Sequence, residues 1–305
     1  ITSPLVFRGY TTTENDGGKG GIDGDGSYSI INDTTLDYVT FWDMHLHNTG
    51  ANKILALDLG CSLIFCEFEN CTATRSIDLG AGANEFTRVI GCHFHNMAHA
   101  GSMMRTGLGI VWGCYFDLTT STGNGSGLEC GQAGTQAHFN IFKMDTTGAR
   151  GIRTWNRSAF VGNSFYNSVA GTLEAIEVRQ DDTLVMNNVI EGWSGVGGSP
   201  IVINSGADNN TILNNAYYNC TSGVDDNGSA NHLEDNNLLG ASPFNDPGND
   251  DFTITDDALL KAAALMKTIP GLGTTNYLDM GAIQRLESAG GPANATRLLK
   301  GTLVN

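Results

Sequence analysis

The chain repeats one short pattern of apolar and polar positions about eight times between residues 36 and 220. Its clearest copy, AFVGNSFYNS at 159–168, reads apolar, any residue, Gly or Asn, Asn or Cys, any residue, aromatic, any residue, Asn. The fourth of these positions falls, copy by copy, at Met44, Cys66, Cys92, Cys114, Ile141, Asn163, Asn188 and Asn215. A regular period of about 20 to 50 residues is typical of solenoids and propellers.

Three short apolar stretches within each repeat alternate with a period of two, as strands do. Such strands cannot bury themselves alone, but coils stacked about 4.8 Å apart would form three parallel sheets around a narrow core. The recurring Asn fits inside a turn, where stacked amides can hydrogen-bond from coil to coil. A propeller would need antiparallel blades and longer repeats. The pattern therefore predicts an all-β protein, a parallel β-helix solenoid of about 8–9 coils.

The limits of the repeat divide the chain into four segments. We expect a Gly/Asp-rich first coil and N-terminal cap at 1–35, the β-helix at 36–248, a capping helix and closing strand at 249–287, and a C-terminal tail at 288–305. The one helix is predicted from DDFTITDDALLKAAALMKTIP at 250–270, with Thr255 as N-cap and a Pro-Gly stop. With one apolar face, this helix would suit the open end of the solenoid.

The overall charge narrows the classes of partner. The chain carries a formal net charge of −16, with only 16 Lys and Arg among 305 residues. Nucleic acids and anionic membranes both need a basic surface, so neither is expected as a partner. We find no run of about 18 apolar residues and expect no membrane insertion.

Seven cysteines are too many by one for complete pairing within the chain. Cys66, Cys92 and Cys114 share one repeat position and should stack as a column inside the solenoid. The pattern favours small buried hydrophobes here over disulfides between coils.

Two further stretches carry a family resemblance. Coils with phrases of the type I-x-V and L-x-x-N-x-F-x-N resemble the right-handed parallel β-helix superfamily, which has the pectate-lyase-like fold. The stretch YLDMGAIQR at 277–285 is similar to the closing strand of many extracellular bacterial and phage-encoded members, and PLVFRGYTTTENDGG at 4–18 to their first coil. The resemblance covers nearly the whole chain and implies a right-handed solenoid. Its members include polysaccharide lyases, glycoside hydrolases, phage tailspikes and inactive adhesins, so it does not choose a function.

Outward positions of three successive repeats carry an unusual set of side chains. His45, Glu67 and His93 should form one column on the surface, and His47, Glu69 and His95 the next. Imidazoles and carboxylates are ordinary ligands of Zn²⁺ and similar ions. A polar ladder without metal explains the same residues, so no cofactor is required, although the set leaves room for a divalent metal.

A second outward set lies on the strand that carries Ile152. Glu129, Arg153 and Glu177 should form one column, with Trp155 and Arg179 in another. The two Glu would be near the separation of an inverting glycosidase pair, about 6.5–9.5 Å. Because Arg153 lies between them and would keep both ionised, a salt-bridged ladder with Arg179 over Trp155 is the favoured interpretation.

These observations favour a non-enzymatic structural or adhesive β-helix, exposed outside a cell or on a virion of the phage tail or capsid-associated type. It would bind a glycan or a surface protein through its sheet faces and the loops at 97–107 and 118–127, and would form a homo-oligomer or larger assembly. The alternative is a lyase or hydrolase with a non-standard site, in which Glu129, Arg153, Glu177 and Arg179 act and Trp155, Trp193, Tyr217 and Tyr218 grip sugar. The Ser, Cys and phosphate-loop signatures of other enzyme classes are absent from the sequence.

Overall fold

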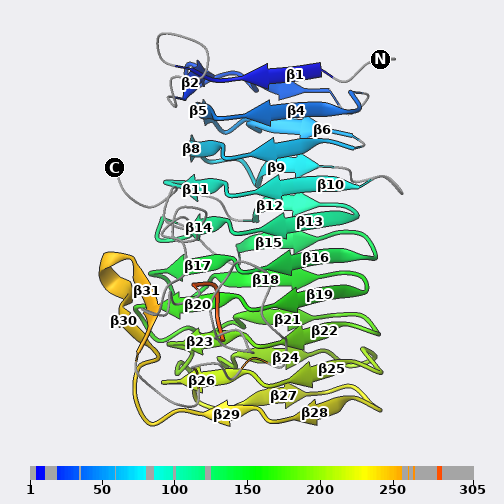
Figure 1. Cartoon of the computed structure of the whole chain (residues 1–305), viewed down its shortest axis with the longest axis vertical. Coiled ribbons are helices and arrows are strands. Elements are labelled where there is room, and N and C mark those ends of the chain that lie inside the picture. The colour runs from blue at the N-terminus through cyan, green and yellow to red at the C-terminus, as the bar shows by residue number, and fades with distance from the viewer. Residues whose placement is uncertain are drawn as a thin grey trace, which may run out of the picture.

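The chain winds into a parallel β-helix of about eight turns, and successive coils add strands to three parallel sheets (Figure 1). The computed structural model describes residues 5–10, 19–33, 36–58, 60–79, 86–98, 101–120, 125–255, 260, 264 and 280–283. Within them the sequence-based fold prediction is confirmed.

Sheets A, B and C are stacks of short strands; each stack extends along the solenoid axis, and the strands lie across it (Figure 1). Sheet A contains β1 (Leu5–Arg8), β4 (Val39–Trp42), β7 (Ser62–Ile64), β10 (Thr87–Ile90), β13 (Gly109–Trp112), β16 (Thr135–His138), β19 (Ser158–Val161), β22 (Leu184–Met186), β25 (Thr211–Leu213) and β28 (His232–Glu234). Sheet B contains β2 (Gly20–Asp23), β5 (Met44–Gly50), β8 (Glu67–Cys71), β11 (His93–His95), β14 (Tyr115–Asp117), β17 (Ile141–Met144), β20 (Ser164–Asn167), β23 (Val189–Glu191), β26 (Ala216–Tyr218) and β29 (Asn237–Leu238). Sheet C contains β3 (Ile31–Asn32), β6 (Leu55–Leu57), β9 (Arg75–Leu79), β12 (Ser102–Thr106), β15 (Ser126–Cys130), β18 (Arg150–Thr154), β21 (Ile176–Val178), β24 (Ile201–Ile203) and β27 (Val224–Asp226).

The first coil is more regular than its Gly/Asp-rich composition suggests. Its described residues place β1, β2 and β3 in register with the coil that follows, pairing Leu5 with Val39, Gly20 with Met44 and Ile31 with Leu55. The solenoid thus includes residues upstream of the expected boundary at 36, and its last strand, β29, ends at Leu238.

The aromatic position of the repeat forms the centre of the core. Five phenylalanine rings stack face to face along the axis, with centroids 4.6–5.1 Å apart. They are Phe68, Phe94, Phe116, Phe142 and Phe165, and all are fully buried. The parallel register places each ring directly over the equivalent ring of the next coil, which is why the repeat requires an aromatic or aliphatic side chain at one fixed offset.

A column of buried amides lines the turn between sheets A and B. Asn163 Oδ1 accepts hydrogen bonds from both the backbone N–H and the side-chain amide of Asn140, at 2.9 and 3.0 Å. Asn188 does the same for Asn163, and Asn215 for Asn188. The anchor of the degenerate copy is therefore Asn140. Ile141 was the wrong choice, because it lies one residue beyond the turn and packs beneath the C-terminal segment.

From the second coil on, each corner between sheets A and B is one residue in the left-handed conformation, directly before the position of the amides and thiols. Glycine occupies several corners, including Gly91 and Gly162, with φ of 61° and 66°. A Cβ on either would lie within 2.8 Å of a phenylalanine ring, Phe65 at one corner and Phe139 at the other. At these two pairs of neighbouring corners, the ring of one corner fills the space that a side chain at the next would need.

The cysteines continue the amide column upward as free thiols. Cys66, Cys92 and Cys114 are buried, and the backbone N–H of Cys114 donates to Asn140 Oδ1 at 2.9 Å. The burial of these three cysteines in one column is as predicted.

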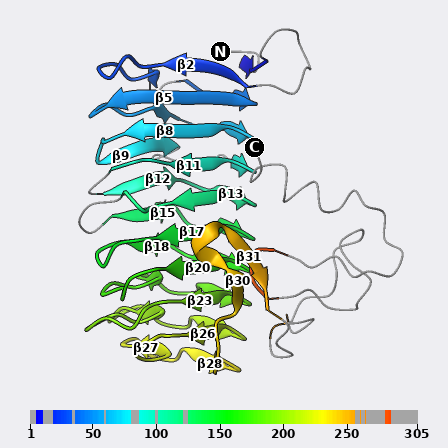
Figure 2. The same ribbon diagram turned by 90° about the vertical axis from the view of Figure 1, so that its left-hand side faces the viewer.

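The segment after Leu238 turns back along the side of the solenoid. A hairpin of β30 (Phe244–Asp246) and β31 (Asp251–Ile254), joined by the 3-10 turn η1 (Pro247–Asn249), lies against the outer face of sheet B (Figures 1 and 2). Phe252 packs edge-on against Tyr115 and Tyr166 of that sheet. The predicted helix beyond Thr255 and most of the closing strand lie outside the described residues.

Replacing Asn163 by Ala should destabilise the protein by roughly 2–5 kcal/mol, because Asn140 loses the acceptor of two hydrogen bonds inside the core. The measurement is the urea midpoint followed by far-ultraviolet circular dichroism. Asn227, which is exposed on the surface, provides the matched control as Asn227→Ala, which should stay within about 0.5 kcal/mol. Equal midpoints for the two variants would contradict a structural role for the amide column.

Candidate functional site

The histidines and glutamates predicted to share a surface do so on the outer face of sheet B. The register pairs His45 with Glu67 and Glu67 with His93, and it pairs Glu69 with both His47 and His95. Strands β5, β8 and β11 thus present a His-x-His, a Glu-x-Glu and a second His-x-His motif side by side. We refer to these six residues as the His/Glu patch.

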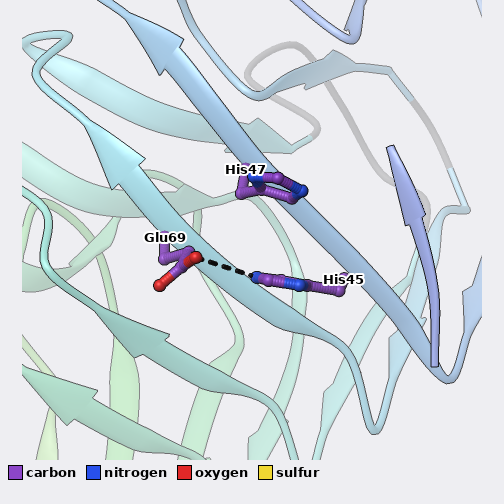
Figure 3. Close-up of side chains that lie close together, drawn as sticks. All are labelled: His45, His47 and Glu69. Atoms are coloured by element: carbon purple, nitrogen blue, oxygen red, sulfur yellow. Dashed lines mark ion pairs between the residues drawn. The ribbon is translucent and has the colours of Figure 1, made fainter. Parts of the chain in front are cut away.

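Two groups of donors form within the His/Glu patch. In the first, Glu69 Oε1 lies 3.3 Å from His45 Nε2, and the rings of His45 and His47 stack at 4.4 Å (Figure 3). In the second, Glu67 Oε1 lies 3.0 Å from His95 Nε2, while Lys19 Nζ lies 2.9 Å from Glu67 Oε2. A contact of 3.6 Å between Glu69 Oε2 and His95 Nδ1 joins the two groups.

The electrostatics of the patch favour neutral His45 and His93 beside an ionised Glu67. Burial lowers the pKa of His93 to about 4 and also lowers the pKa of His45. The hydrogen bond to His95 is the main reason that the pKa of Glu67 falls well below its usual range, and Lys19 adds to it against the effect of burial. Neutral imidazole nitrogens with lone pairs and an anionic carboxylate are what a divalent cation requires.

Each of the two groups offers three ligand atoms that lie within 4.8 Å of one another. The first consists of His45, His47 and Glu69, and the second of Glu67, His93 and His95. Two imidazoles with one carboxylate suit a zinc-like ion better than Ca²⁺ or Mg²⁺, which prefer oxygen ligands.

Two charged groups around this patch have no signal in the repeat. Lys19 reaches Glu67 from two coils above, beside the start of β2. Below the patch, Asp250 of the C-terminal hairpin accepts a hydrogen bond from the hydroxyl of Tyr115 at 2.6 Å and pairs with Lys143 Nζ at 2.6 Å. Since Tyr115 is the neighbour of His93 in the next coil, the hairpin marks the lower edge of the patch.

The second predicted set lies on the outer face of sheet C and extends further than the sequence suggested. One column alternates in sign along five consecutive coils, from Asp78 through Arg105, Glu129 and Arg153 to Glu177. We call this column the sheet C ladder. Its order confirms the predicted register of Glu129, Arg153 and Glu177.

Flanking cations complete the sheet C ladder. Arg153 and Arg179 bind Glu177 at 2.9 and 2.7 Å, whereas Glu129 is bound by Arg75 at 3.0 Å. Lys53 and Arg105 each approach Asp78 at 2.8 Å, and Arg150 also pairs with Glu177. Sequence reasoning missed Arg75 and Lys53 because neither occupies a position in this column. Each reaches the column only through its long side chain.

The aromatic residues proposed to grip sugar separate into two kinds. Trp155 is 41% exposed, and the guanidinium of Arg179 lies over its ring at 4.3 Å, as the columns predicted. Trp193 and Tyr217 are buried in the core and have no exposed face, so their assignment to a sugar site is wrong. Tyr217 occupies the stacked aromatic position of its repeat, and Tyr218 packs against the C-terminal cluster.

The loops expected to carry a binding surface are shorter than predicted. Residues 97–107 include β12, and residues 118–127 include the start of β15. Residues 99–100 and 121–124 lie outside the described residues. The candidate functional residues that the structure describes lie on the outer faces of sheets B and C.

No protein-family model matches this chain, and no curated protein matches its sequence. The structure defines the class of the protein, which is a parallel β-helix with charged outer sheet faces. Among the described residues no helix is long and apolar enough to cross a membrane.

Asp78→Asn should cost about 1–3 kcal/mol of unfolding free energy at pH 7, because Lys53 and Arg105 lose a buried charged partner. Burial disfavours the Asp78 carboxylate, but the two cations outweigh it and lower its pKa. A depressed pKa in the folded state stabilises the protein above the unfolded value of about 3.9, and that contribution is lost as pH falls through the folded value. The difference in urea midpoint between wild type and variant should therefore be constant from about pH 7 to pH 5 and shrink near pH 3.

Asp225→Asn is the matched control, since Asp225 is an exposed carboxylate on the last strand of the same sheet. It should leave the midpoint within about 0.5 kcal/mol of wild type. A cost for Asp78→Asn that persists undiminished at about pH 3 would show that the ion pairs are not its source.

Proposed function

We propose that this protein is a non-enzymatic β-helix, displayed outside a cell or on a phage particle, that binds an anionic glycan along the outer face of sheet C. The observation that carries the proposal is a row of cations, of which Arg75 and Arg179 are more exposed than the carboxylates they bind, beside the exposed ring of Trp155.

On this face the cations and the carboxylates differ in solvent exposure as well as in position along the chain. Arg75 is 38% exposed, whereas its partner Glu129 is 6% exposed; Arg179 is 25% exposed and Glu177 only 4%. The ion pairs of this face include the cations Lys53, Arg75, Arg105, Arg150, Arg153 and Arg179 and the carboxylates Asp78, Glu129, Glu174 and Glu177. Because the cations outnumber the carboxylates in these ion pairs, and Lys53, Arg75 and Arg179 are more exposed than their partners, the surface potential here favours an anion.

The spacing of the cations suits a chain-like ligand. Coils lie about 4.8 Å apart, so cations on successive coils form a line along the axis. A polysaccharide with regularly spaced carboxylates or sulfates can contact several of them, and a guanidinium that already pairs with one carboxylate retains further N–H donors. Trp155 adds an apolar surface on which a sugar ring can stack.

The same ion pairs on sheet C support the part of the proposal that the protein is not an enzyme. A general acid needs a raised pKa. Glu177 is buried, which alone would raise its pKa, yet Arg179, Arg150 and Arg153 together lower it. Glu129 is held by Arg75 and by the hydroxyl of Ser102. Neither carboxylate is arranged as the acid of a glycosidase pair.

We further propose assembly of several copies through the lower end of the solenoid. Strands β27, β28 and β29 form the last described coil, and Leu233 and Leu238 there are 40% and 68% exposed. Unpaired strand edges with exposed leucines favour contact with another chain.

Binding of polygalacturonate should be measured by isothermal titration calorimetry, with neutral dextran for comparison. We expect binding of the anionic polymer alone, weakening as salt rises. Arg75→Gln and Trp155→Ala should each weaken it about tenfold, which corresponds to about 1.4 kcal/mol.

Arg88→Gln is the matched control, because Arg88 is an exposed arginine on sheet A and its loss changes the net charge equally. It should leave the affinity unchanged, and an equal loss there would indicate attraction without a site. No binding of polygalacturonate, alginate or heparin would refute the proposed ligand. Release of unsaturated product or new reducing ends, lost in Glu177→Gln, would establish the enzyme instead.

A further inference from the structure

The first donor group of the His/Glu patch has a polar atom that the protein leaves without a partner. His45 Nε2 is shielded from solvent and makes no hydrogen bond, although Glu69 Oε1 lies only 3.3 Å away. The two atoms are close but are not aligned for a hydrogen bond. A buried nitrogen of this kind calls for an explanation, and metal coordination is one that the surrounding atoms support.

We propose that His45, His47 and Glu69 bind one divalent transition-metal ion of the zinc type on the outer face of sheet B, at a site separate from the glycan surface of sheet C.

The geometry requires only small movements. The three ligand atoms lie within 4.8 Å of one another, and bonds of about 2.0–2.2 Å to a tetrahedral ion would bring them to about 3.5 Å. His45 and His47 extend from the same face of β5, with their rings stacked, and Glu69 faces them from β8 (Figure 3). An ion between them would be held by two neighbouring strands of a rigid sheet, with its fourth position open to water.

The charge balance favours this group over the second one. Glu69 forms no ion pair with a lysine or arginine in the described part of the chain, and its contacts are to His45 and His95. Glu67 is already bound by the ammonium of Lys19 and by His95. An ion at Glu67, His93 and His95 would share the Glu67 carboxylate with the positive charge of Lys19, so the first ion binds at His45, His47 and Glu69.

Hard cations are poor candidates for this site. Ca²⁺ takes six to eight oxygen ligands and Mg²⁺ keeps most of its water, whereas two of the three ligands here are imidazole nitrogens. Zn²⁺, Co²⁺ and Ni²⁺ accept nitrogen with carboxylate oxygen. The ligand set therefore defines the class of ion as well as its place.

The test is titration of the full chain, after treatment with EDTA, with ZnCl₂ and CoCl₂ by isothermal titration calorimetry and by thermal unfolding. We expect one tight site per chain, a rise in melting temperature with Zn²⁺, and visible absorption from Co²⁺ in a tetrahedral site. His47→Gln and Glu69→Gln should each weaken binding at least about tenfold, and the rise in melting temperature should shrink accordingly. CaCl₂ should give neither binding nor a shift.

Two variants separate this site from its neighbours. His232→Gln changes a histidine that also contacts a glutamate, Glu234 at 3.0 Å, but lies in the last coil, and it should bind Zn²⁺ as the wild type does. His93→Gln changes the second group and should leave the first ion in place. Circular dichroism in EDTA checks that each variant is folded. Loss of a purely structural contact would change the melting temperature itself but not the rise in melting temperature that Zn²⁺ causes.

No binding of Zn²⁺ or Co²⁺ by the wild type would overturn the proposal. Wild-type affinity in both His47→Gln and Glu69→Gln would do so as well, and a loss in His93→Gln as large as that in His47→Gln would place the ion elsewhere. None of these outcomes bears on glycan binding, because the sheet C residues are unchanged in every variant.

Discussion

In the amide column, each asparagine accepts hydrogen bonds from one coil and donates to the next, and the register of these coils depends on that contact. Asn163 links the coils of Asn140 and Asn188, and the stacked rings of Phe142 and Phe165 lie two residues further on. A shift of one residue would leave an amide unpaired inside the core and turn a phenylalanine toward solvent. The stack therefore fixes its register, and register in turn converts sequence offsets into columns on the outer faces.

Much of this arrangement could be predicted because, in a parallel solenoid, the repeat period and a residue's position within the repeat determine which side chains become neighbours. Once Phe68 and Phe94 are placed inside, Glu67 and His93 must lie outside and next to each other. The error at Ile141 arose where the repeat is degenerate, since HFNIFKMD offers two adjacent candidates and only the structure shows that Asn140 continues the amide column.

The remaining errors have different physical causes. Lys19 and Arg75 reach carboxylates outside their own column, and the reach of a long side chain is not encoded in strand alternation. Asp250 approaches Tyr115 through a hairpin that lies outside the repeat altogether. Tyr217 was a different case: it occupies the inward aromatic position of its repeat, so the pattern itself contained the signal that its ring faces the core.

The alternation of charge along sheet C limits which coils the protein can gain or lose. In many solenoids a whole coil can be gained or lost because each coil contacts only its neighbours. Here, deletion of the coil that carries Glu129 would bring Arg105 beside Arg153, and like charges directly opposite each other are destabilising. Coils in this region can be gained or lost only in pairs if the pattern of signs is to survive. The same parity holds on sheet B, where loss of the coil with Glu67 and Glu69 would stack four histidines without a carboxylate. In these coils, electrostatics as well as packing therefore limits how many coils can be added or removed.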